Sequence, residues 1–457
     1  MTDTPRSGRI STKRQRIAEL ARQVPEMSFT NLAHHMDIEW LHAAYDTTRK
    51  DGAVGLDGQT AKQYAEDLEG NLESLLNRFK SGRYRAPAVR RVHIPKGKGD
   101  KTRPIGVPTF EDKVLQRAVT MLLESVYEQD FLDCSYGFRP GRSAHQALET
   151  IRRQMVSMRG GWVIDLDIQG FFDALDHGHL RTFLDQRVRD GVLRRAIGKW
   201  LNAGVVENGS WRQSDSGTPQ GGVVSPLLAN VYLHHVLDKW FVTEVQPRLR
   251  GRSFMVRYAD DVVIVVEQET DAQRVMEVLP RRLARFGLTM HPTKSRLIDF
   301  RAPRDKRGDG DDDDRPPGVF DFLGFTHFWG QTRKGGWALK RRTAKDRFRR
   351  CLKAIYRWCR WNRHQPIVVQ HRKLIRKLQG HRAYYGLMGN SRSLNVFRYR
   401  VLEVWQKWLN ERSQKPSMPR HRFWGWLLQR YPVPALTLLH PPPGLRSKPI
   451  ALRSRMR

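Results

Sequence analysis

The sequence predicts an α+β fold, with short antiparallel strands and helices over residues 84–329 and an all-helical part after them. Three observations support this prediction. The stretch 254–266, FMVRYADDVVIVV, reads as a β-hairpin, because two apolar runs flank a pair of aspartates. Residues 161–168, GWVIDLDI, end in alternating apolar and acidic side chains with the period of a strand. From Lys340 onward the apolar residues recur at helical spacing.

The predicted hairpin places two adjacent carboxylates, Asp260 and Asp261, at its tip. Val, Ile, Phe and Tyr favour strands at 254–258 and 262–266, whereas Asp-Asp favours a turn. Adjacent like charges repel, and a divalent cation removes that repulsion. Mg²⁺ prefers hard oxygen ligands and is usually held by one or two carboxylates together with substrate phosphates. Taken alone, the YADD motif fits a plain acidic turn about as well as a metal site.

A third carboxylate ligand is expected from the strand 161–168 or from the residues that follow it. Asp165 and Asp167 share one face of this strand, and Asp173 comes shortly afterwards. On spacing alone these three residues are rival candidates. His177 is expected to be structural, because Mg²⁺ does not seek imidazole ligands.

The composition indicates a nucleic-acid partner. The 457 residues include 81 Lys and Arg against 47 Asp and Glu, a formal net charge of +34. Such an excess repels itself unless a polyanion shares the surface. No apolar run is long enough to span a bilayer, the start of the chain lacks the apolar core of a signal peptide, and the three cysteines have no zinc-site spacing. We therefore expect a bacterial cytoplasmic protein that does not contact membranes.

The positive charge is concentrated in residues 331–457, which hold 32 Lys and Arg and three Asp and Glu. Seven of the 13 tryptophans also lie there. Basic surface with interleaved aromatic rings suits RNA, whose phosphates take the charge and whose unstacked bases stack on rings. Trp405 and Trp408, three positions apart on an apolar stripe, are better explained as helix core.

Local signals predict the other elements. Thr60, Thr109 and Ser143 are expected to cap helices. The expected helices cover residues 29–45, 61–79, 110–126, 144–148 onward, from about His177, 274–286, 340–361, 371–387, 394–414 and 422–429. Residues 214–240 are expected to be a Gly/Pro loop that opens a long amphipathic helix. Further strands are expected at residues 84–87, 89–94, within 287–300 and at 319–329. Residues 301–318 are read as a disordered acidic insertion and residues 431–457 as an extended tail.

Two basic loops are candidate binding segments. In PKGKGDKTRPIGVPT, residues 95–109, Lys96 and Arg103 belong to a flexible turn that can close over a triphosphate. In SYGFRPGRSAHQAL, Arg139 and Arg142 are candidates for holding a nucleic-acid backbone. Both loops could equally be solvated basic turns with surface arginines.

The motifs YADD, SYGFRPGRSAHQAL, DIQGFFDALDH, GTPQGGVVSPLLAN, GLTMHPTKS and FLGF together resemble the reverse transcriptases encoded by group II introns. The loop DGAVGLDG and residues 380–410 look like the N-terminal extension and the thumb or maturase domain of that family. The resemblance implies a right-hand polymerase. Its expected parts are a helical N-terminal extension at 1–83, fingers and an antiparallel palm at 84–329, a helical thumb/maturase domain at 330–415, and a basic, proline-rich segment at 416–457 that is a candidate for DNA binding.

The resemblance also implies the reaction and its residues. The reaction is RNA-directed DNA synthesis by a two-metal-ion mechanism with Mg²⁺, for which Mn²⁺ can substitute. Asp167, rather than Asp165 or Asp173, matches the catalytic position, together with Asp260 and Asp261. The resemblance assigns the metal to Asp167, Ile168 through its carbonyl, Asp260 and Asp261, and the nucleotide to Lys96, Arg103, Phe172, Gln220, Ala259 and Lys294. Phe172 matches an aromatic gate against a 2′-hydroxyl.

The implied partners are an RNA template, expected to be a group II intron RNA, a DNA target or primer, and dNTPs, for a monomer or homodimer. The implied roles beyond polymerisation are intron RNA binding, splicing as a maturase, and retrohoming. Two different roles stay open: that of a domesticated relative in DNA repair or phage defence, and that of a splicing cofactor that no longer polymerises. Many members of the family carry a C-terminal Cys/His-rich endonuclease, and none is recognised here, so autonomous second-strand cleavage is not expected.

Overall fold

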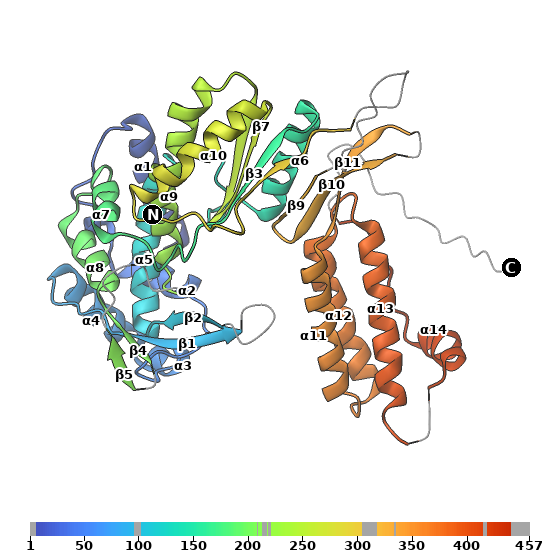
Figure 1. Cartoon of the computed structure of the whole chain (residues 1–457). Coiled ribbons are helices and arrows are strands. Elements are labelled where there is room, and N and C mark those ends of the chain that lie inside the picture. Colours follow the sequence, from blue (N-terminus) through green and yellow to red (C-terminus); the bar gives the residue numbers. More distant parts are fainter. Residues whose placement is uncertain are drawn as a thin grey trace. The chain divides into compact units, whose positions relative to one another are not determined.

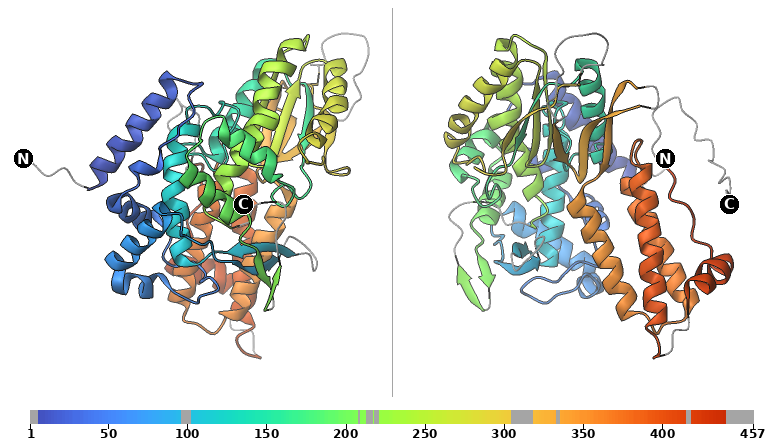
Figure 2. Two further views of the ribbon diagram at one scale, coloured as in Figure 1. Left: turned by 90° about the vertical axis from the view of Figure 1, so that its left-hand side faces the viewer. Right: turned by 45° about the vertical axis from the view of Figure 1, so that its right-hand side comes forward.

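The computed structural model describes residues 6–95, 102–207, 209–212, 217, 221–303, 318–332, 335–414 and 418–439. The chain forms two compact units, Met1–Ile298 and Asp299–Arg457 (Figures 1 and 2). Within the described ranges every helix is too short or too polar to cross a bilayer. Cys134, Cys351 and Cys359 are free thiols.

The first unit is rich in helices. They are α1 (Arg6–Gln23), α2 (Ile38–Thr47), α3 (Ala61–Tyr64), α4 (Leu68–Lys80), α5 (Phe110–Tyr127), α6 (Ala144–Met158), α7 (His177–Asp185), α8 (Gly191–Leu201), α9 (Ser225–Leu233) and α10 (Glu269–Ala284). The three predicted caps are confirmed: the side chains of Thr60, Thr109 and Ser143 accept hydrogen bonds at the starts of α3, α5 and α6. Helix α9 continues into π-helical turns at His234–Asp238 and Phe241–Val245.

Two four-stranded sheets complete this unit. One has the order β2-β1-β4-β5 and the other has the order β6-β7-β3-β8. The strands are β1 (Val89–Pro95), β2 (Thr102–Val107), β3 (Trp162–Leu166), β4 (Val205–Glu207), β5 (Ser210–Arg212), β6 (Ser253–Tyr258), β7 (Asp261–Val266) and β8 (Arg296–Asp299). The predicted hairpin is confirmed as β6 and β7, which pair antiparallel, and β3 pairs antiparallel with β7. In the first sheet β1 and β4 run parallel, whereas β1 with β2 and β4 with β5 are antiparallel.

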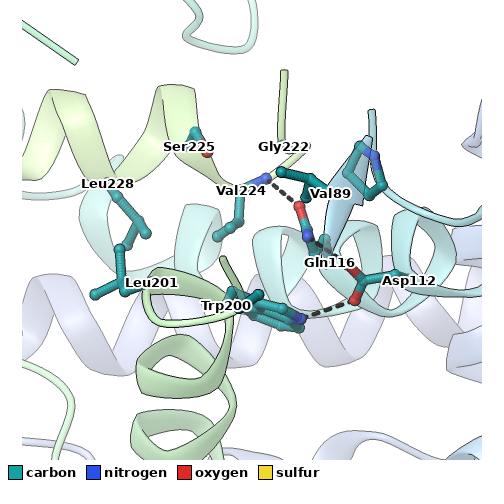
Figure 3. A pocket seen from close by; sticks show the side chains of 11 residues that line it. Val89, Asp112, Gln116, Trp200, Leu201, Gly222, Val224, Ser225 and Leu228 are labelled. Atoms are coloured by element: carbon teal, nitrogen blue, oxygen red, sulfur yellow. Dashed lines mark hydrogen bonds between the residues drawn. The ribbon is translucent and has the colours of Figure 1, made fainter. Parts of the chain in front are cut away.

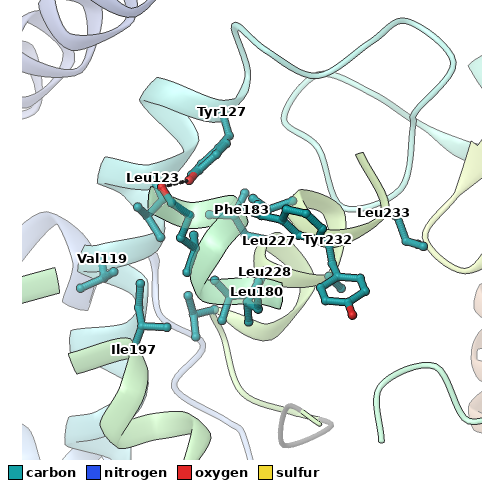
Figure 4. Close-up of a cluster of buried hydrophobic side chains, with 14 of the residues drawn as sticks. Val119, Leu123, Tyr127, Leu180, Phe183, Ile197, Leu227, Leu228, Tyr232 and Leu233 are labelled. Atoms are coloured by element: carbon teal, nitrogen blue, oxygen red, sulfur yellow. Dashed lines mark hydrogen bonds between the residues drawn. The ribbon is translucent and has the colours of Figure 1, made fainter. Parts of the chain in front are cut away.

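The core of the first unit is built around α5. Its apolar residues are buried almost all round, and Figure 4 shows them meeting side chains of α7, α8 and α9. Helices α6 and α10 pack against the second sheet. The drawn cluster includes Val119, Leu123, Tyr127, Leu180, Phe183, Ile197, Leu227, Leu228, Tyr232 and Leu233. Hydrophobic burial on this scale holds the second sheet and the loop before α9 on one rigid base.

Some local predictions for the first unit are wrong. Residues 84–87 form no strand, and the helix expected at 29–45 begins at Ile38, after a short 3₁₀ turn at Ala33–His35. The side chain of Asp37 caps α2 by accepting from the Trp40 backbone N–H, which fixes this later start. The β4–β5 hairpin was not predicted, because its strands have three residues each and show no clear alternation.

The second unit combines a three-stranded antiparallel sheet with a helical bundle. The sheet has the order β11-β10-β9, and helices α11, α12 and α13 lie side by side (Figure 1). The elements are β9 (Val319–Phe322), β10 (Phe325–Gln331), β11 (Trp337–Thr343), α11 (Lys345–Trp361), α12 (Ile367–Tyr385), α13 (Ser391–Asn410) and α14 (Leu428–Arg430), the last preceded by a π-helical turn at Arg422–Leu427.

The prediction that the chain is all-helical after residue 330 is wrong. Residues Trp337–Thr343 form β11, which pairs along its whole length with β10. The physical reason is that buried and exposed side chains alternate there, with Arg341 and Thr343 buried on one face. This period of two outweighs the helical spacing of apolar residues that the sequence shows from Lys340. The acidic insertion predicted at 301–318 lies largely outside the described residues.

Candidate active site

The β6–β7 hairpin presents the two adjacent aspartates as predicted. Tyr258 pairs with Asp261, so Ala259 and Asp260 form the turn. Ala259 has φ of 57°, in the left-handed region that a residue with a Cβ rarely adopts. Asp260 is partly exposed and Asp261 is exposed, although the strands behind them are buried. A strained turn between buried strands therefore holds two carboxylates at the protein surface.

A fully buried arginine supports this turn from below. Arg257 forms an ion pair with Asp238, with Nε donating to Oδ1 at 2.7 Å and Nη2 donating to Oδ2 at 2.5 Å. It also donates to Asn230 Oδ1 at 2.8 Å, to Ser135 Oγ at 2.8 Å and to the carbonyl of Ala259 at 3.1 Å. Each of its five N–H groups thus has an acceptor, which is the condition under which a buried charge is tolerated.

The segment before Arg139 reinforces the same turn. The Tyr136 N–H donates to the Arg257 carbonyl at 2.8 Å, and Asn230 Nδ2 donates to the Gly137 carbonyl at 2.7 Å. A Cβ on Gly137 would lie 2.3 Å from the nitrogen of Ala259. A glycine is required here because no side chain fits between the two backbones.

Strand β3 ends beside the hairpin. Its last residue, Leu166, pairs with Val262, the residue after Asp261, so Asp167 directly follows the strand end nearest the hairpin tip. The backbone of Asp167 is fixed by hydrogen bonds from its N–H to Ser295 Oγ, 3.1 Å, and from the His291 N–H to its carbonyl, 2.8 Å. Of Asp165 and Asp167, Asp167 is therefore the one that lies just past the strand end, beside the hairpin.

Its rival Asp165 is placed differently. It pairs with Val263, inside the sheet, and its carboxylate accepts from Arg296 Nη2 at 3.1 Å. Asp167 instead faces the ammonium of Lys294, with Nζ 3.2 Å from Oδ2. The structure thus brings together Lys294 and Asp167, two residues that the sequence analysis assigned to one site.

A pocket of about 370 Å³ opens beside the hairpin tip. Its size suits a ligand as large as a nucleotide. Residues predicted to act at the site are part of its lining, as are several that were not predicted. The lining consists of Arg103, Ile105, Phe138, Phe172, Gly221, Gly222, Ser225, Pro226, Tyr258, Ala259, Asp260 and Asp261.

Phe172 lies in the wall of this pocket and is fixed by its neighbours. Its ring packs edge to face against Phe171, with 5.3 Å between the ring centroids, and 8% of the residue is exposed. A Cβ on Gly217 would lie 2.6 Å from the Phe172 carbonyl, so this backbone is closely packed. Lys96 and Gln220, the remaining predicted nucleotide contacts, lie outside the described residues.

The two arginines predicted to contact nucleic acid differ in their surroundings. Arg139 is buried, donates to the carboxylate of Glu128 at 3.0 Å and donates to the carbonyls of Leu132 and Ser135. A direct contact of Arg139 with nucleic acid would require it to leave these partners. Arg142 lies nearer the surface and pairs with Asp133 at 2.5 Å.

Sequence reasoning missed Phe138 and the Arg257–Asp238 pair. Phe138 has φ of 58° and is 56% exposed, with its ring centroid 6.5 Å from that of Tyr258. An exposed phenylalanine with a strained backbone in a pocket wall is typical of a functional residue. The only signal in the sequence was its position inside a glycine-rich loop.

The donors at the hairpin fit a hard cation, because carboxylate and carbonyl oxygens are the ligands that Mg²⁺ prefers. In the part of the chain that the structure describes, no three Asp, Glu, His or Cys side chains converge as a preassembled metal site. Asp167 pairs with the ammonium of Lys294, whose positive charge balances that of the carboxylate.

Paired carboxylates on a hairpin that line a nucleotide-sized pocket, with a further carboxylate just past the end of the neighbouring strand, are typical of nucleic-acid polymerases. Residues 94–327 match the family model described as "Reverse transcriptase (RNA-dependent DNA polymerase)". This match covers half of the sequence, and the chain belongs to this family. The resemblance to reverse transcriptases encoded by group II introns is confirmed by the relatives.

Three relatives illustrate the range of similarity. The group II intron-encoded protein LtrA of Lactococcus lactis subsp. cremoris is 42% identical over 199 residues, which are 44% of this chain and 32% of LtrA. Protein YkfC of Escherichia coli (strain K12) is 35% identical over 293 residues, 56% of this chain and 76% of YkfC. The nuclear intron maturase 2, mitochondrial, of Arabidopsis thaliana is 28% identical over 231 residues, 42% of this chain and 30% of the maturase. The match with LtrA thus spans about a third of the length of that protein.

Proposed function

We propose that this chain is an RNA-directed DNA polymerase of the group II intron type that also binds intron RNA and assists its splicing. The observation that supports this most strongly is the position of Asp260 and Asp261. They line a nucleotide-sized pocket next to the strand end that carries Asp167, in a chain of the reverse transcriptase family. The proposed arrangement is a right hand, with an N-terminal extension at 1–83, fingers and palm at 84–329, a thumb/maturase domain at 330–415 and a basic segment at 416–457.

The carboxylates of Asp167, Asp260 and Asp261, with the carbonyl of Ile168, would hold the metal ions. Two bound Mg²⁺ ions supply activation of the primer 3′-hydroxyl and neutralisation of the triphosphate and the leaving pyrophosphate. The protein's own contribution is to keep these oxygen ligands on adjacent strand ends. The buried Arg257 network and the packed backbone of Gly137 do this without occupying the pocket.

The pocket wall would select and orient the nucleotide. Arg103 supplies a guanidinium for the triphosphate, and guanidinium groups match phosphate oxygens in geometry. The buried Phe172 would lie against the sugar and leave no room for a 2′-hydroxyl. Ala259 would bring its backbone close to the ligand, and Lys294 would act beside Asp167. Lys96 and Gln220 complete the proposed set on the sequence resemblance alone.

The second unit offers rings and cations for RNA. Trp361 is 77% exposed at the end of α11, a helix rich in Lys and Arg, and Trp426 is 50% exposed, with the Arg422 guanidinium 5.6 Å from its ring centroid. Exposed rings between cations suit stacking on unpaired bases. Trp405 is fully buried and donates to Gln370 Oε1 at 3.0 Å, so its prediction as helix core is confirmed. Arg142 on the first unit is a further proposed nucleic-acid contact.

Primer extension tests the polymerase function. The purified chain, an RNA template and an annealed DNA primer should extend the primer with dNTPs and Mg²⁺, and rNTPs alone should support little extension. No extension with dNTPs would contradict the proposal and would favour the alternative role of a splicing cofactor that does not polymerise. Sequencing of RNA that co-purifies with the chain separates an intron-linked polymerase from one that serves repair or defence. A structured intron in that RNA supports the intron-linked role, and a diverse pool supports repair or defence.

A further inference from the structure

A buried polar network lies behind the loop that walls the pocket. Asp112 and Gln116 are one turn apart on α5 and are 2% and 3% exposed. Gln116 Oε1 accepts from the backbone N–H of Val223 at 2.7 Å. It also accepts from the backbone N–H of Val224 at 3.3 Å (Figure 3). Val224 is the N-cap of α9 and provides no side-chain cap of its own. The amide of Gln116 therefore gives these two N–H groups, at and just before the start of α9, an acceptor from another helix.

Asp112 sets the orientation of that amide. Gln116 Nε2 donates to Asp112 Oδ2 at 3.0 Å, while Asp112 Oδ1 accepts from Trp200 Nε1 at 2.8 Å and from the Tyr84 hydroxyl. Burial raises the pKa of Asp112 to about 6, so the carboxylate is mainly ionised at pH 8. An ionised carboxylate only accepts hydrogen bonds, so it draws the NH₂ of Gln116 and turns the amide oxygen toward the loop.

The described end of the loop before α9, residues 221–224, is closely held by its neighbours. Gly221 and Gly222 line the pocket together with Asp260 and Asp261. Gly221 has φ of 119°, and a Cβ on it would lie 2.3 Å from the Gly106 carbonyl of β2. Gly221 is packed against β2, and Val223, two residues later, is hydrogen-bonded to Gln116. A shift at Val223 therefore moves the pocket wall.

We propose that Asp112 and Gln116 are positioning residues for the nucleotide pocket, which hold the Gly221–Gly222 wall in the geometry that binds the incoming dNTP. This inference rests on the proposed polymerase function. Asp112 and Gln116 act through the backbone of Val223 and Val224, because neither side chain lines the pocket beside the hairpin tip.

The polarity of the network can be broken and restored. In Asp112→Asn the new NH₂ group faces the NH₂ of Gln116, so the amide turns and presents a donor to the two backbone donors. In Gln116→Glu a second carboxylate faces Asp112. In the double variant Asp112→Asn/Gln116→Glu, the Asn NH₂ donates to one Glu oxygen and the other accepts from Val223 and Val224. The donor–acceptor pattern is then complete again.

Steady-state primer extension at pH 8 should show this pattern in the KM for dNTP. Each single variant should raise KM about ten-fold, as expected for a buried hydrogen-bonding group left unpaired. The double variant should return KM to within about three-fold of the wild type. The Kd for the primer–template duplex should stay unchanged in all three, because the pocket wall does not hold the duplex.

Two controls separate positioning from stability. Ser125→Ala removes a buried hydroxyl that donates to the Met121 carbonyl on the same helix, away from the loop, and should lower Tm without changing KM. Trp200→Phe removes one donor to Asp112 Oδ1 while keeping an aromatic ring, and should raise KM by about three-fold. This variant provides the test of positioning if the single variants at Asp112 and Gln116 fail to fold.

Variants that lower Tm and keep the KM of the wild type would overturn the inference, as would a double variant with a KM no better than either single. These outcomes require an active wild-type protein. A wild type that does not extend primers would contradict the proposed polymerase function instead, so the two failures are distinguishable.

Discussion

Arg257 donates a hydrogen bond of 3.1 Å to the carbonyl of Ala259, across the turn that presents Asp260. The guanidinium of Arg257 is fully buried, and the carboxylate of Asp238, also fully buried, neutralises its charge. This bond links a fully buried ion pair to the turn that carries Asp260 in the candidate active site.

Replacing Arg257 by Met should destabilise the protein by about 3 kcal/mol or more, because Asp238 is left as an uncompensated buried charge. The double variant Arg257→Met/Asp238→Leu should recover much of that stability, since no charge remains buried. It should still extend primers poorly, because the Ala259 carbonyl has lost its donor. Chemical denaturation and primer extension measure the two effects, and a fully active double variant would contradict the role of Arg257 in the turn.

Phe172→Ala should weaken discrimination against ribonucleotides. The smaller side chain leaves space beside the sugar, and the ratio of kcat/KM for dNTP over rNTP should fall roughly ten- to hundred-fold. Phe171→Ala is the matched control, since that ring packs against Phe172 but is absent from the pocket lining. An unchanged ratio in Phe172→Ala would contradict the gate.

Lys294→Met should increase the affinity for divalent metal, because the Lys294 ammonium competes for the Asp167 carboxylate. The pair is about half exposed, so the gain should be up to about five-fold in Kd for Mn²⁺. Arg296→Met, which frees Asp165 from a similarly exposed partner, should leave the Kd unchanged. Titration with Mn²⁺ followed by electron paramagnetic resonance measures both, and equal effects of the two variants would argue against Asp167 as the ligand.

Acid should weaken the second unit through His327. Burial lowers the pKa of His327 to about 3, and the Arg341 charge acts in the same direction. A lowered folded-state pKa gives stability that is present above the unfolded value near 6.5 and is lost as the pH falls toward 3. Between pH 7 and 4.5 this histidine should account for roughly 2 to 3 kcal/mol of lost stability.

The variant His327→Phe should remove that share of the acid sensitivity. The phenyl ring can keep the stacking on Phe320, whose centroid lies 4.7 Å away. Urea denaturation at pH 7 and at pH 4.5 provides the measurement. An equal loss of stability in the variant and the wild type would contradict the assignment.

Local sequence signals predicted those parts of the fold that short segments decide. The caps at Thr60, Thr109 and Ser143 and the hairpin at Asp260 all depend on neighbouring residues. The pairing of Trp337–Thr343 with β10 was missed, because strand formation there depends on a partner and on which side chains it buries.

The candidate site shows the same difference between features set by neighbouring residues and features set by distant partners. The positions of Asp260 and Asp261 were predicted from the local pattern of their own hairpin. The spacing of residues in the sequence could not choose between Asp165 and Asp167. Strand register and the partners Arg296 and Lys294 distinguish those two in the structure. The contacts of Arg257 with Asp238, and of Gln116 with Val223, join segments far apart in the chain, and no periodicity of a single sequence reveals such pairs.

The most direct test of the account compares two aspartates on one strand face. Single-turnover extension of a DNA primer on an RNA template should fall by about a thousand-fold in Asp167→Asn and Asp260→Asn, as expected when a ligand of the catalytic metal ions is lost. Asp165→Asn, two residues from Asp167 on the same strand, should extend the primer at close to the wild-type rate. Near-normal extension by Asp167→Asn, or an equal loss in Asp165→Asn, would contradict the assignment of the catalytic carboxylates.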